Sequence, residues 1–409
     1  MNNNPSSAPQ GAASASPLAA NRWTVLAVLY ASRIIMGFQF QTIGPISPLL
    51  VDALEIDYAE LGTLIGFYML PGVVLALPSG ILGRRYGDSN MVKWGLLAMG
   101  IGGLIMGYGD TYAVVSVGRI LSGAGAIFLN VLMVKMIADW FGGKELFIAM
   151  AILISSWPMG IGIGLVSFPA IALMWSWQAV MYLSAGVAFA SLGLLIWKYR
   201  PSPNAVDASD EGFRIGLLPR EWLLILLCGM VWGFFNVGFI ILLSFGSDIF
   251  VALGYSLGDA GYVVSMAGWI SIAIVPLGGY IAGRFGHVNW IMTICFLVSA
   301  AGMIYFGQTS SPIMLFILVS MIGVFPAAMI VALPPEVLRP SARGAGLGLF
   351  FTLFYVCMAV LPGIAGWTRD LTGDPVAPFY FGAFMMICSL ISLIPFRIFQ
   401  KRLPIPTAG

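Results

Sequence analysis

Twelve long apolar segments constrain this chain more than any other feature of its sequence. A helix rises about 1.5 Å per residue and needs about 20 mostly apolar residues to cross a hydrocarbon core of about 30 Å. The chain has 59% hydrophobic and only 9% charged residues, whereas a water-soluble domain carries about 25% charged residues. We therefore predict an all-α polytopic membrane protein with membrane-spanning helices at 23–47, 60–82, 91–109, 112–137, 146–168, 177–198, 221–247, 259–283, 289–308, 311–335, 345–366 and 378–399.

One connection divides these segments into two sets of six. Residues 199–220 form the only connection that is long, polar and contains proline, so we predict a linker between an N-terminal bundle, 23–198, and a C-terminal bundle, 221–400. Residues 1–22 are rich in Asn, Ser, Ala and Pro and lack the basic start and apolar centre of a signal peptide. We expect them to be a retained, disordered tail, and residues 401–409 to be a second tail.

The charges of the connections predict the orientation of the chain. If the N-terminus is cytoplasmic, the outer connections hold one basic residue, Arg369, beside the acidic residues Asp52, Glu55, Asp57 and Glu60. The inner connections then hold the basic residues that flank the segments, among them Arg84, Arg85, Arg284, Arg339, Arg397 and Arg402. The positive-inside rule therefore predicts a multi-pass protein of the cell inner membrane with both termini in the cytoplasm.

Several classes of protein lack support in this sequence. The net charge of +2 gives no argument for binding nucleic acid. The four cysteines lie in apolar runs without metal-ligand spacing, and the chain has one histidine, His287, with neither a nucleophile elbow nor a phosphate-binding loop. We therefore expect no enzyme activity, no metal and no cofactor.

A short motif recurs in the two halves. Residues 80–87 read GILGRRYG and residues 279–286 read GYIAGRFG, an offset of 199. Each copy closes the second segment of its half on the inner side. Two copies at equivalent places indicate duplication of a six-helix unit.

At these residues the chain resembles the major facilitator superfamily, over nearly its whole length from Arg22 to Arg402. The family's loop motif is Gly-x-x-x-Asp-Arg-x-Gly-Arg, and Gly80, Arg85 and Gly87 match it, with Arg84 in place of the aspartate. The resemblance implies two six-helix bundles, and a loop that helps to latch them together on the cytoplasmic side.

The second copy keeps Gly279, Arg284 and Gly286, with Gly283 at the aspartate position. Because both copies lack the aspartate, the family's usual charge-based latch is in doubt here. The arginines also lie at helix C-termini, where a cation meets the negative end of the helix dipole. A role as simple membrane-edge anchors is the alternative.

The segment 146–168 contains Trp157-Pro-Met-Gly-Ile-Gly-Ile-Gly164. Small residues at this spacing let helices approach closely, and Pro158 loosens the backbone hydrogen-bond ladder. Close packing alone explains the run. A hinge for alternating access at Pro158, Gly160 and Gly162 is the functional alternative.

Two arginines lie inside predicted membrane segments. Arg33 falls near the membrane midplane and Arg119 lies closer to the outer side, while no Asp or Glu lies deep in any segment. A charge at the bilayer centre costs at least about 2.5–3.5 kcal/mol, and such residues usually face an aqueous cavity. A bound anion would balance these cations, and the arginine fork suits a carboxylate. Gln41 lies on the Arg33 side of segment 23–47 and Gln39 lies further round, while Asn130 shares the face of Arg119. These three are the expected polar neighbours.

The sequence Tyr30-Ala-Ser-Arg33 resembles the Tyr-x-Asp-Arg signature of the organic anion:cation symporter branch. That resemblance implies a substrate anion held by Arg33 and by Arg119, which matches the branch's second arginine. Ser32 and Ala126 stand where the branch has its proton-carrying carboxylates. Anion binding therefore carries over and proton coupling does not, so uniport, exchange or coupling through other groups is expected. Alternatively, Arg119 only ties helices together through backbone carbonyls.

The C-terminal half offers polar and aromatic candidates for the same cavity. Trp232 and Asn236 lie one helical turn apart, as do Phe351 and Tyr355. Aromatic residues of membrane helices more often face lipid or pack in the core. Lining of the substrate cavity is the functional alternative.

We predict a secondary active or facilitative transporter of a small anion, an organic carboxylate, that works by alternating access. We expect it to function as a monomer in the lipid bilayer. The alternatives are a proton-driven exporter of lipophilic compounds, a cyanate- or nitrate-like inorganic anion permease, and a transport-inactive sensor or partner protein.

Overall fold

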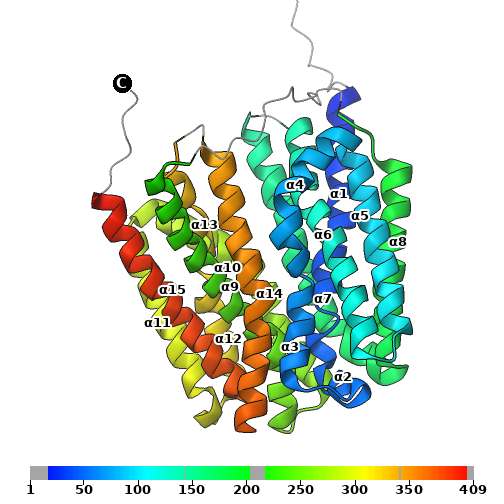
Figure 1. Cartoon of the computed structure of the whole chain (residues 1–409), viewed down its shortest axis with the longest axis vertical. Helices are drawn as coiled ribbons and strands as arrows, with labels where there is room; N and C mark the ends of the chain where they lie inside the picture. The colour runs from blue at the N-terminus through cyan, green and yellow to red at the C-terminus, as the bar shows by residue number, and fades with distance from the viewer. Residues whose placement is uncertain (1–16, 142, 203–216, 340–341, 403–409) are drawn as a thin grey trace, which may run out of the picture.

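The computed structural model describes residues 17–141, 143–202, 217–339 and 342–402. Figure 1 shows two bundles of helices side by side, the N-terminal half in blue to green and the C-terminal half in green to red. The helices of the N-terminal half are α1 (Pro17–Phe40), η1 (Gly44–Ile46), α2 (Ser47–Leu54), α3 (Tyr58–Phe67), α4 (Leu70–Tyr86), α5 (Asp88–Tyr108), α6 (Tyr112–Trp140), α7 (Gly143–Met174) and α8 (Trp177–Lys198). Those of the C-terminal half are α9 (Pro219–Ala252), α10 (Leu257–Phe285), α11 (Val288–Tyr305), η2 (Phe306–Gln308), α12 (Pro312–Val324), α13 (Ala327–Val331), η3 (Pro334–Glu336), α14 (Arg343–Thr372) and α15 (Ala377–Arg402).

Within the described residues, twelve helical stretches are long and apolar enough to cross a membrane. The predicted number of spans and the all-α fold of two six-helix bundles are confirmed. The predicted linker lies mostly outside the described residues, as do residues 1–16 and 403–409 of the predicted tails. Helix α1 starts at Pro17, before the predicted position.

Three of the predicted spans are broken, although the sequence predicts continuous helices. The first span breaks after Phe40, the second between α3 and α4, and the tenth after Val324. A proline follows each break, at residues 45, 71 and 326. Proline has no N–H group, and its ring clashes with the carbonyl four residues earlier.

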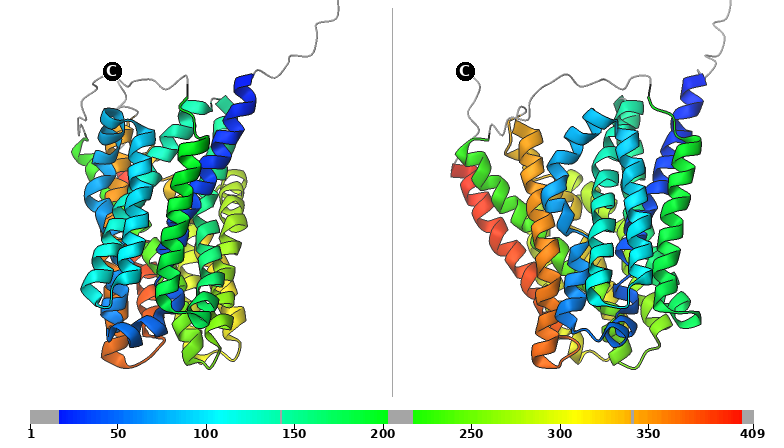
Figure 2. Two further views of the ribbon diagram at one scale, coloured as in Figure 1. Left: turned by 90° about the vertical axis from the view of Figure 1, so that its right-hand side faces the viewer. Right: turned by 45° about the vertical axis from the view of Figure 1, so that its right-hand side comes forward.

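We call the end of the molecule where α1 begins and α15 finishes the terminal end, and the opposite end the distal end (Figure 1). Glycines bring the two halves into backbone contact toward the distal end. A Cβ atom at Gly62 or Gly66 would overlap the carbonyl of Pro362 or Ala359 on α14. By contrast, Figure 2 shows α15 leaning away from the N-terminal half toward the terminal end. The halves therefore pack most closely away from the termini.

Candidate functional site

The Arg33 side chain lies among α1, α6 and α7 and is only 5% exposed. Its Nη1 donates to the carbonyl of Leu153 at 2.9 Å and to Ser156 Oγ at 3.1 Å, and its Nη2 donates to Asn130 Oδ1 at 2.7 Å. Its Nε has no hydrogen-bond partner. All three acceptors are neutral, so none of them balances the charge of the guanidinium, and its Nε edge is unused.

Asn130 carries this network into the C-terminal half. Its Nδ2 donates to Tyr355 Oη at 3.0 Å, so α6 of one half is bonded to α14 of the other. The Tyr355 ring fits against α4 because residue 72 is glycine, where a Cβ atom would overlap the ring. The structure thus brings together three predicted site residues, Arg33, Asn130 and Tyr355, from both halves.

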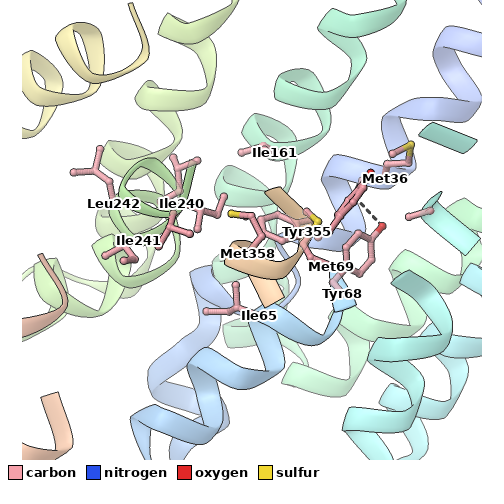
Figure 3. Packing of buried hydrophobic residues seen from close by; sticks show 14 of the residues in the cluster. Met36, Ile65, Tyr68, Met69, Ile161, Ile240, Ile241, Leu242, Tyr355 and Met358 are labelled. Atoms are coloured by element: carbon pink, nitrogen blue, oxygen red, sulfur yellow. Dashed lines mark hydrogen bonds between the residues drawn. The ribbon is translucent and has the colours of Figure 1, made fainter. Parts of the chain in front are cut away.

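Apolar side chains lie beside Tyr355 on its distal side, where Gly62 and Gly66 pack on α14. Because Gly66 packs on α14 one turn from Tyr355 and Gly72 packs on its ring, the stretch between these glycines lies along α14. Figure 3 shows Ile65 and Met69 from this stretch beside Met358 and Tyr355. A ligand at Arg33 would therefore have an apolar neighbourhood toward the distal end.

Arg119 is fully buried, and all three of its nitrogens have partners. Nε donates to the Leu64 carbonyl at 3.0 Å, Nη1 to the Gln39 carbonyl at 2.7 Å and to Thr42 Oγ1 at 3.1 Å, and Nη2 to the Phe40 carbonyl at 2.6 Å. These carbonyls lie next to the breaks in the first two spans, and the Gln39 carbonyl also accepts from the Thr42 N–H and hydroxyl at 3.3 and 3.0 Å. In a membrane such carbonyls must be satisfied internally, and Arg119 does this.

Arg119 and Asn130 nevertheless share one face of α6, as the sequence predicts. That face runs along α1, with Asn130 opposite Arg33 and Arg119 opposite the end of the helix at Phe40. The two arginines have no hydrogen-bond partner in common. The structure therefore does not join Arg33 and Arg119 around one ligand position.

Gln39 and Gln41 are buried beside the break in the first span. Gln39 Nε2 donates to the carbonyl of Met99 at 3.0 Å, and its Oε1 has no partner. Neither side-chain polar atom of Gln41 has a partner. These glutamines and Arg33 have no hydrogen-bond partner in common, so their part in a substrate site stays a prediction.

Trp232 belongs to an aromatic cluster between α9 and α14. Its ring stacks on Phe235 and Phe350 with centroid distances of 5.5 and 6.2 Å, and its Nε1 has no partner. Phe354 contacts both Trp232 and Tyr355, at 6.1 and 5.0 Å, so the cluster adjoins the Arg33 network. Asn236 Nδ2 donates to the Trp232 carbonyl at 2.7 Å, which ties this amide to its own helix.

The predicted latch residues lie at the terminal end, and their ring contacts among the described residues stay within one half. Arg85 and Arg284 are exposed, and each lies over the ring of the residue that follows it. Gly87 and Gly286 have positive φ, 87° and 65°, which explains why both copies of the loop need glycine there. A Cβ atom at Gly80 would meet nothing within 4 Å, and one at Gly279 would meet only Ala328 of its own half. A latch between halves stays a prediction.

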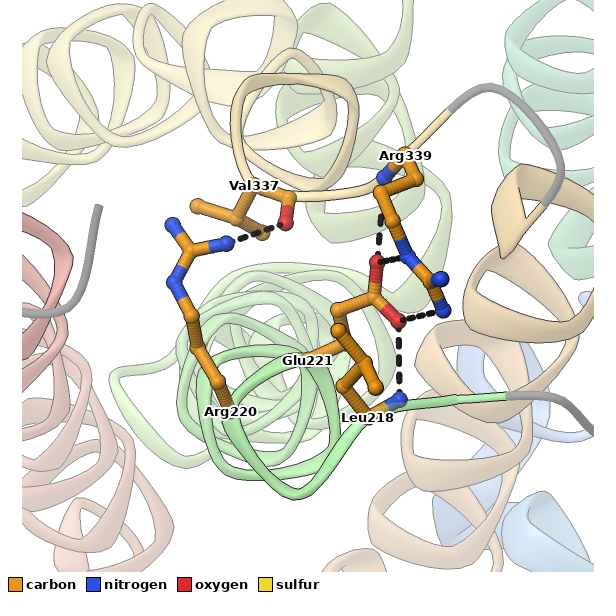
Figure 4. A network of polar contacts seen from close by, with 5 residues as sticks. All are labelled: Leu218, Arg220, Glu221, Val337 and Arg339. Atoms are coloured by element: carbon orange, nitrogen blue, oxygen red, sulfur yellow. Dashed lines mark hydrogen bonds and ion pairs between the residues drawn. The ribbon is translucent and has the colours of Figure 1, made fainter. Parts of the chain in front are cut away.

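Sequence reasoning missed an ionic cluster at the terminal end of the C-terminal half. Figure 4 shows Glu221, which is fully buried, accepting hydrogen bonds from the Arg339 Nε and Nη2 at 2.9 and 3.0 Å. The backbone N–H groups of Leu218 and Arg339 also donate to it, at 2.9 and 3.1 Å. The hydrogen bonds to Glu221 raise the pKa of Arg339 above its ordinary value.

A second cluster joins the halves at the distal end. Asp370 of α14 accepts from the backbone N–H groups of Tyr58 and Ala59 at 2.9 and 2.7 Å, at the start of α3. The Tyr58 hydroxyl donates to Asp248 at 3.1 Å, and Asp248 pairs with Arg369, which lies 3.7 Å from the centroid of the Tyr58 ring. Arg369 is the lone basic residue of the predicted outer connections, and this isolated charge was the sequence signal for the contact.

The predicted hinge run lies in a continuous helix. Gly160 packs on the backbone of α1, and Gly162 packs on Trp269 of α10 in the other half. Helix α7 continues through Pro158. Close packing therefore accounts for both glycines, and a hinge at Pro158 stays a prediction.

Comparisons with known proteins agree with this architecture. The family model for the Major Facilitator Superfamily matches residues 29–251 and 222–408. The inner membrane transport protein YajR of Escherichia coli is 24% identical over 76% of this chain and 70% of its own length. An uncharacterized MFS-type transporter of Caenorhabditis elegans is 23% identical over 84% of this chain, which spans 64% of that relative's length.

Among solved structures, a D-xylose–proton symporter superposes with a TM-score of 0.76 at 18% identity, covering 94% of this chain and 98% of the symporter. At this identity the likeness shows the fold alone. The family model covers more than half of the chain, and the family consists of membrane transporters that are not enzymes. This chain therefore belongs to the Major Facilitator Superfamily.

Proposed function

We propose that this transporter carries a small anion, an organic carboxylate, by alternating access around the site at Arg33. The observation that carries the proposal is a buried guanidinium whose three acceptors are neutral and whose Nε is unpaired. An unpaired charge in a low-dielectric interior is costly. A carboxylate accepts hydrogen bonds only, and arginine binds it through two parallel N–H groups.

The position of the site between the halves supports alternating access. Arg33 and Asn130 belong to the N-terminal half and Tyr355 to the C-terminal half, so relative motion of the halves would remake the site. The hydrogen bonds of Asp370 and Tyr58 join the halves at the distal end. We infer that the conformation described is closed at the distal end and that substrate exchanges at the terminal end.

The distribution of charge supports an inner-membrane orientation with cytoplasmic termini. The terminal end carries Arg84, Arg85 and Arg284, which are exposed, whereas Asp57 and Glu60 lie at the distal end. The positive-inside rule then makes the terminal end cytoplasmic. Cysteine labelling of an inserted residue in the 373–376 connection, in intact cells, tests this orientation, and labelling only after cell lysis contradicts it.

A binding screen tests the anion site. Purified protein is heated with a series of carboxylates and inorganic anions, and a ligand raises the melting temperature in proportion to RT ln(1 + [L]/Kd). We expect a concentration-dependent rise with a carboxylate that disappears in Arg33→Gln. Arg402→Gln is the matched control because this arginine is exposed at the end of α15, and it should keep the full rise.

Transport of the selected anion is then measured by counterflow in proteoliposomes. We expect Arg33→Gln to abolish counterflow and Arg402→Gln to retain it. Normal counterflow of the anion by the Arg33→Gln protein would show that the site is elsewhere. Counterflow of a hydrophobic cation with proton movement would instead support the exporter alternative.

A further inference from the structure

We infer that the site at Arg33 selects a singly charged carboxylate with an apolar body, over dicarboxylates and amino acids. The inference rests on the proposed function and narrows its substrate class. Its first support is the number of available cations. Every nitrogen of the Arg119 guanidinium donates to an acceptor, and three of its four acceptors are backbone carbonyls of the broken spans. Arg33, by contrast, keeps an unpaired nitrogen. One cation balances one negative charge.

The second support is the hydrogen-bonding polarity of the site. Asn130 Oδ1 is occupied by Arg33, and the Leu153 carbonyl receives bonds from both Arg33 and Ser156. Ser156 Oγ accepts from Arg33 while its own hydrogen is donated to Leu153. Donors remain: the Nε–H and the second Nη2–H of Arg33, the second Nδ2–H of Asn130, and the hydroxyl hydrogen of Tyr355, whose oxygen already accepts from Asn130.

A site that offers free donors, and whose acceptors Asn130 Oδ1, Ser156 Oγ and the Leu153 carbonyl already bond the Arg33 cation, suits a carboxylate, which only accepts. An ammonium group carries three donors and would have to share Asn130 Oδ1 and Ser156 Oγ with the Arg33 guanidinium, a like charge at hydrogen-bond distance from both oxygens. A zwitterion would therefore lose hydrogen bonds that it makes to water. The penalty for a buried, unpaired charged group is larger than the gain from a typical hydrogen bond.

The third support is the apolar character of the buried side chains near Tyr355. Ile65, Met69 and Met358 belong to the buried apolar cluster next to its ring (Figure 3). Methionine side chains are flexible and polarisable and adapt to ligands of different shape. A second carboxylate placed here would be desolvated without a cation, whereas an alkyl group would gain contacts.

Three ligands with the same six-carbon size test the inference: 4-methylpentanoate, adipate and leucine. Binding to the full-length protein in detergent is measured by calorimetry and by thermal shift. We expect 4-methylpentanoate to bind at least tenfold more tightly than the other two, a difference of about 1.4 kcal/mol. Arg33→Gln should weaken it at least tenfold and Tyr355→Phe several-fold, with Arg402→Gln unchanged. Size-exclusion profiles confirm that the variants are folded, and Arg33→Lys, which keeps the charge but loses the fork, serves if the glutamine variant aggregates.

The possible failures are distinguishable. If adipate or leucine binds as tightly as 4-methylpentanoate and depends on Arg33, the site takes anions but the inferred selectivity is wrong. If none of the three, and no other anion of the screen, binds in a way that depends on Arg33, the proposed function itself is wrong and this inference falls with it.

Discussion

Replacing Arg119 by glutamine distinguishes an arginine that holds the fold from one that holds a ligand. Arg119 donates four buried hydrogen bonds at 2.6–3.1 Å, three of them to the carbonyls of Gln39, Phe40 and Leu64. Glutamine is shorter and has one donor group. The substitution therefore leaves carbonyls at both helix breaks without partners in the protein interior.

The size of the effect follows from these bonds. The Gln39 carbonyl also accepts from the Thr42 hydroxyl and backbone N–H, so the carbonyls of Phe40 and Leu64 are the two that lose their partner. A buried carbonyl that loses its partner costs about 1–3 kcal/mol, so two carbonyls amount to roughly 2–6 kcal/mol. Hydrogen bonds within membrane proteins average about 0.6 kcal/mol in double-mutant cycles, which sets a lower bound of about 2 kcal/mol. Since 1 kcal/mol corresponds to roughly 2–4 °C in a medium-sized domain, we expect the melting temperature to fall by on the order of 5 °C or more.

Heated samples in detergent, analysed by size-exclusion chromatography, measure this change. Arg33→Gln is the matched comparison, because it also removes a buried arginine but leaves the Leu153 carbonyl bonded to Ser156. We expect it to melt closer to the parent than Arg119→Gln does. If Arg119→Gln melts at the parent temperature and loses anion binding, Arg119 is a ligand-binding residue and the structural reasoning is wrong.

Three further substitutions test other parts of the mechanism. Gly62→Ala should block closure of the distal end and reduce transport at least tenfold, because its Cβ would overlap the Pro362 carbonyl. Gly193→Ala, at an open position, is the control. Equal transport by both variants would contradict the role of this close contact in closure. Asp370→Asn weakens the capping of α3 across the halves, so cysteine labelling at the distal end should rise several-fold. Unchanged labelling would show that this contact does not hold the distal end closed. Glu221→Gln removes a buried carboxylate that accepts four hydrogen bonds; we expect a loss of about 2–4 kcal/mol of stability, measured as a lower melting temperature, with anion affinity in the stable fraction unchanged.

Much of the architecture was predictable from sequence because the bilayer imposes it. Long apolar runs must form helices in a medium that cannot hydrogen-bond the backbone, and the repeated GRRYG and GRFG loops mark the duplication. The membrane cost of a charge likewise singles out Arg33 and Arg119. These inferences need only the composition of each segment and the order of its residues.

The broken spans were not predictable from proline alone. Pro158 lies within a continuous helix, whereas Pro45 and Pro71 follow breaks. The difference at the first two breaks lies in a partner remote in sequence, since Arg119 of α6 bonds the carbonyls that the breaks release. At these two breaks, therefore, the bonding of the released carbonyls depends on a side chain that another helix supplies.

The sequence alone determined the helices, their number, the two halves and the buried cations, because hydrophobicity and charge act locally on each segment. Only the tertiary structure decided which cation is available. Arg33 and Arg119 are the same residue type in similarly apolar segments. Arg33 bonds one carbonyl and two neutral side chains and keeps a free nitrogen, whereas Arg119 bonds three carbonyls and one hydroxyl and has no free nitrogen. The hydrogen-bond partners of a side chain come from helices far away in the chain, so only the packing of those helices distinguishes the two arginines.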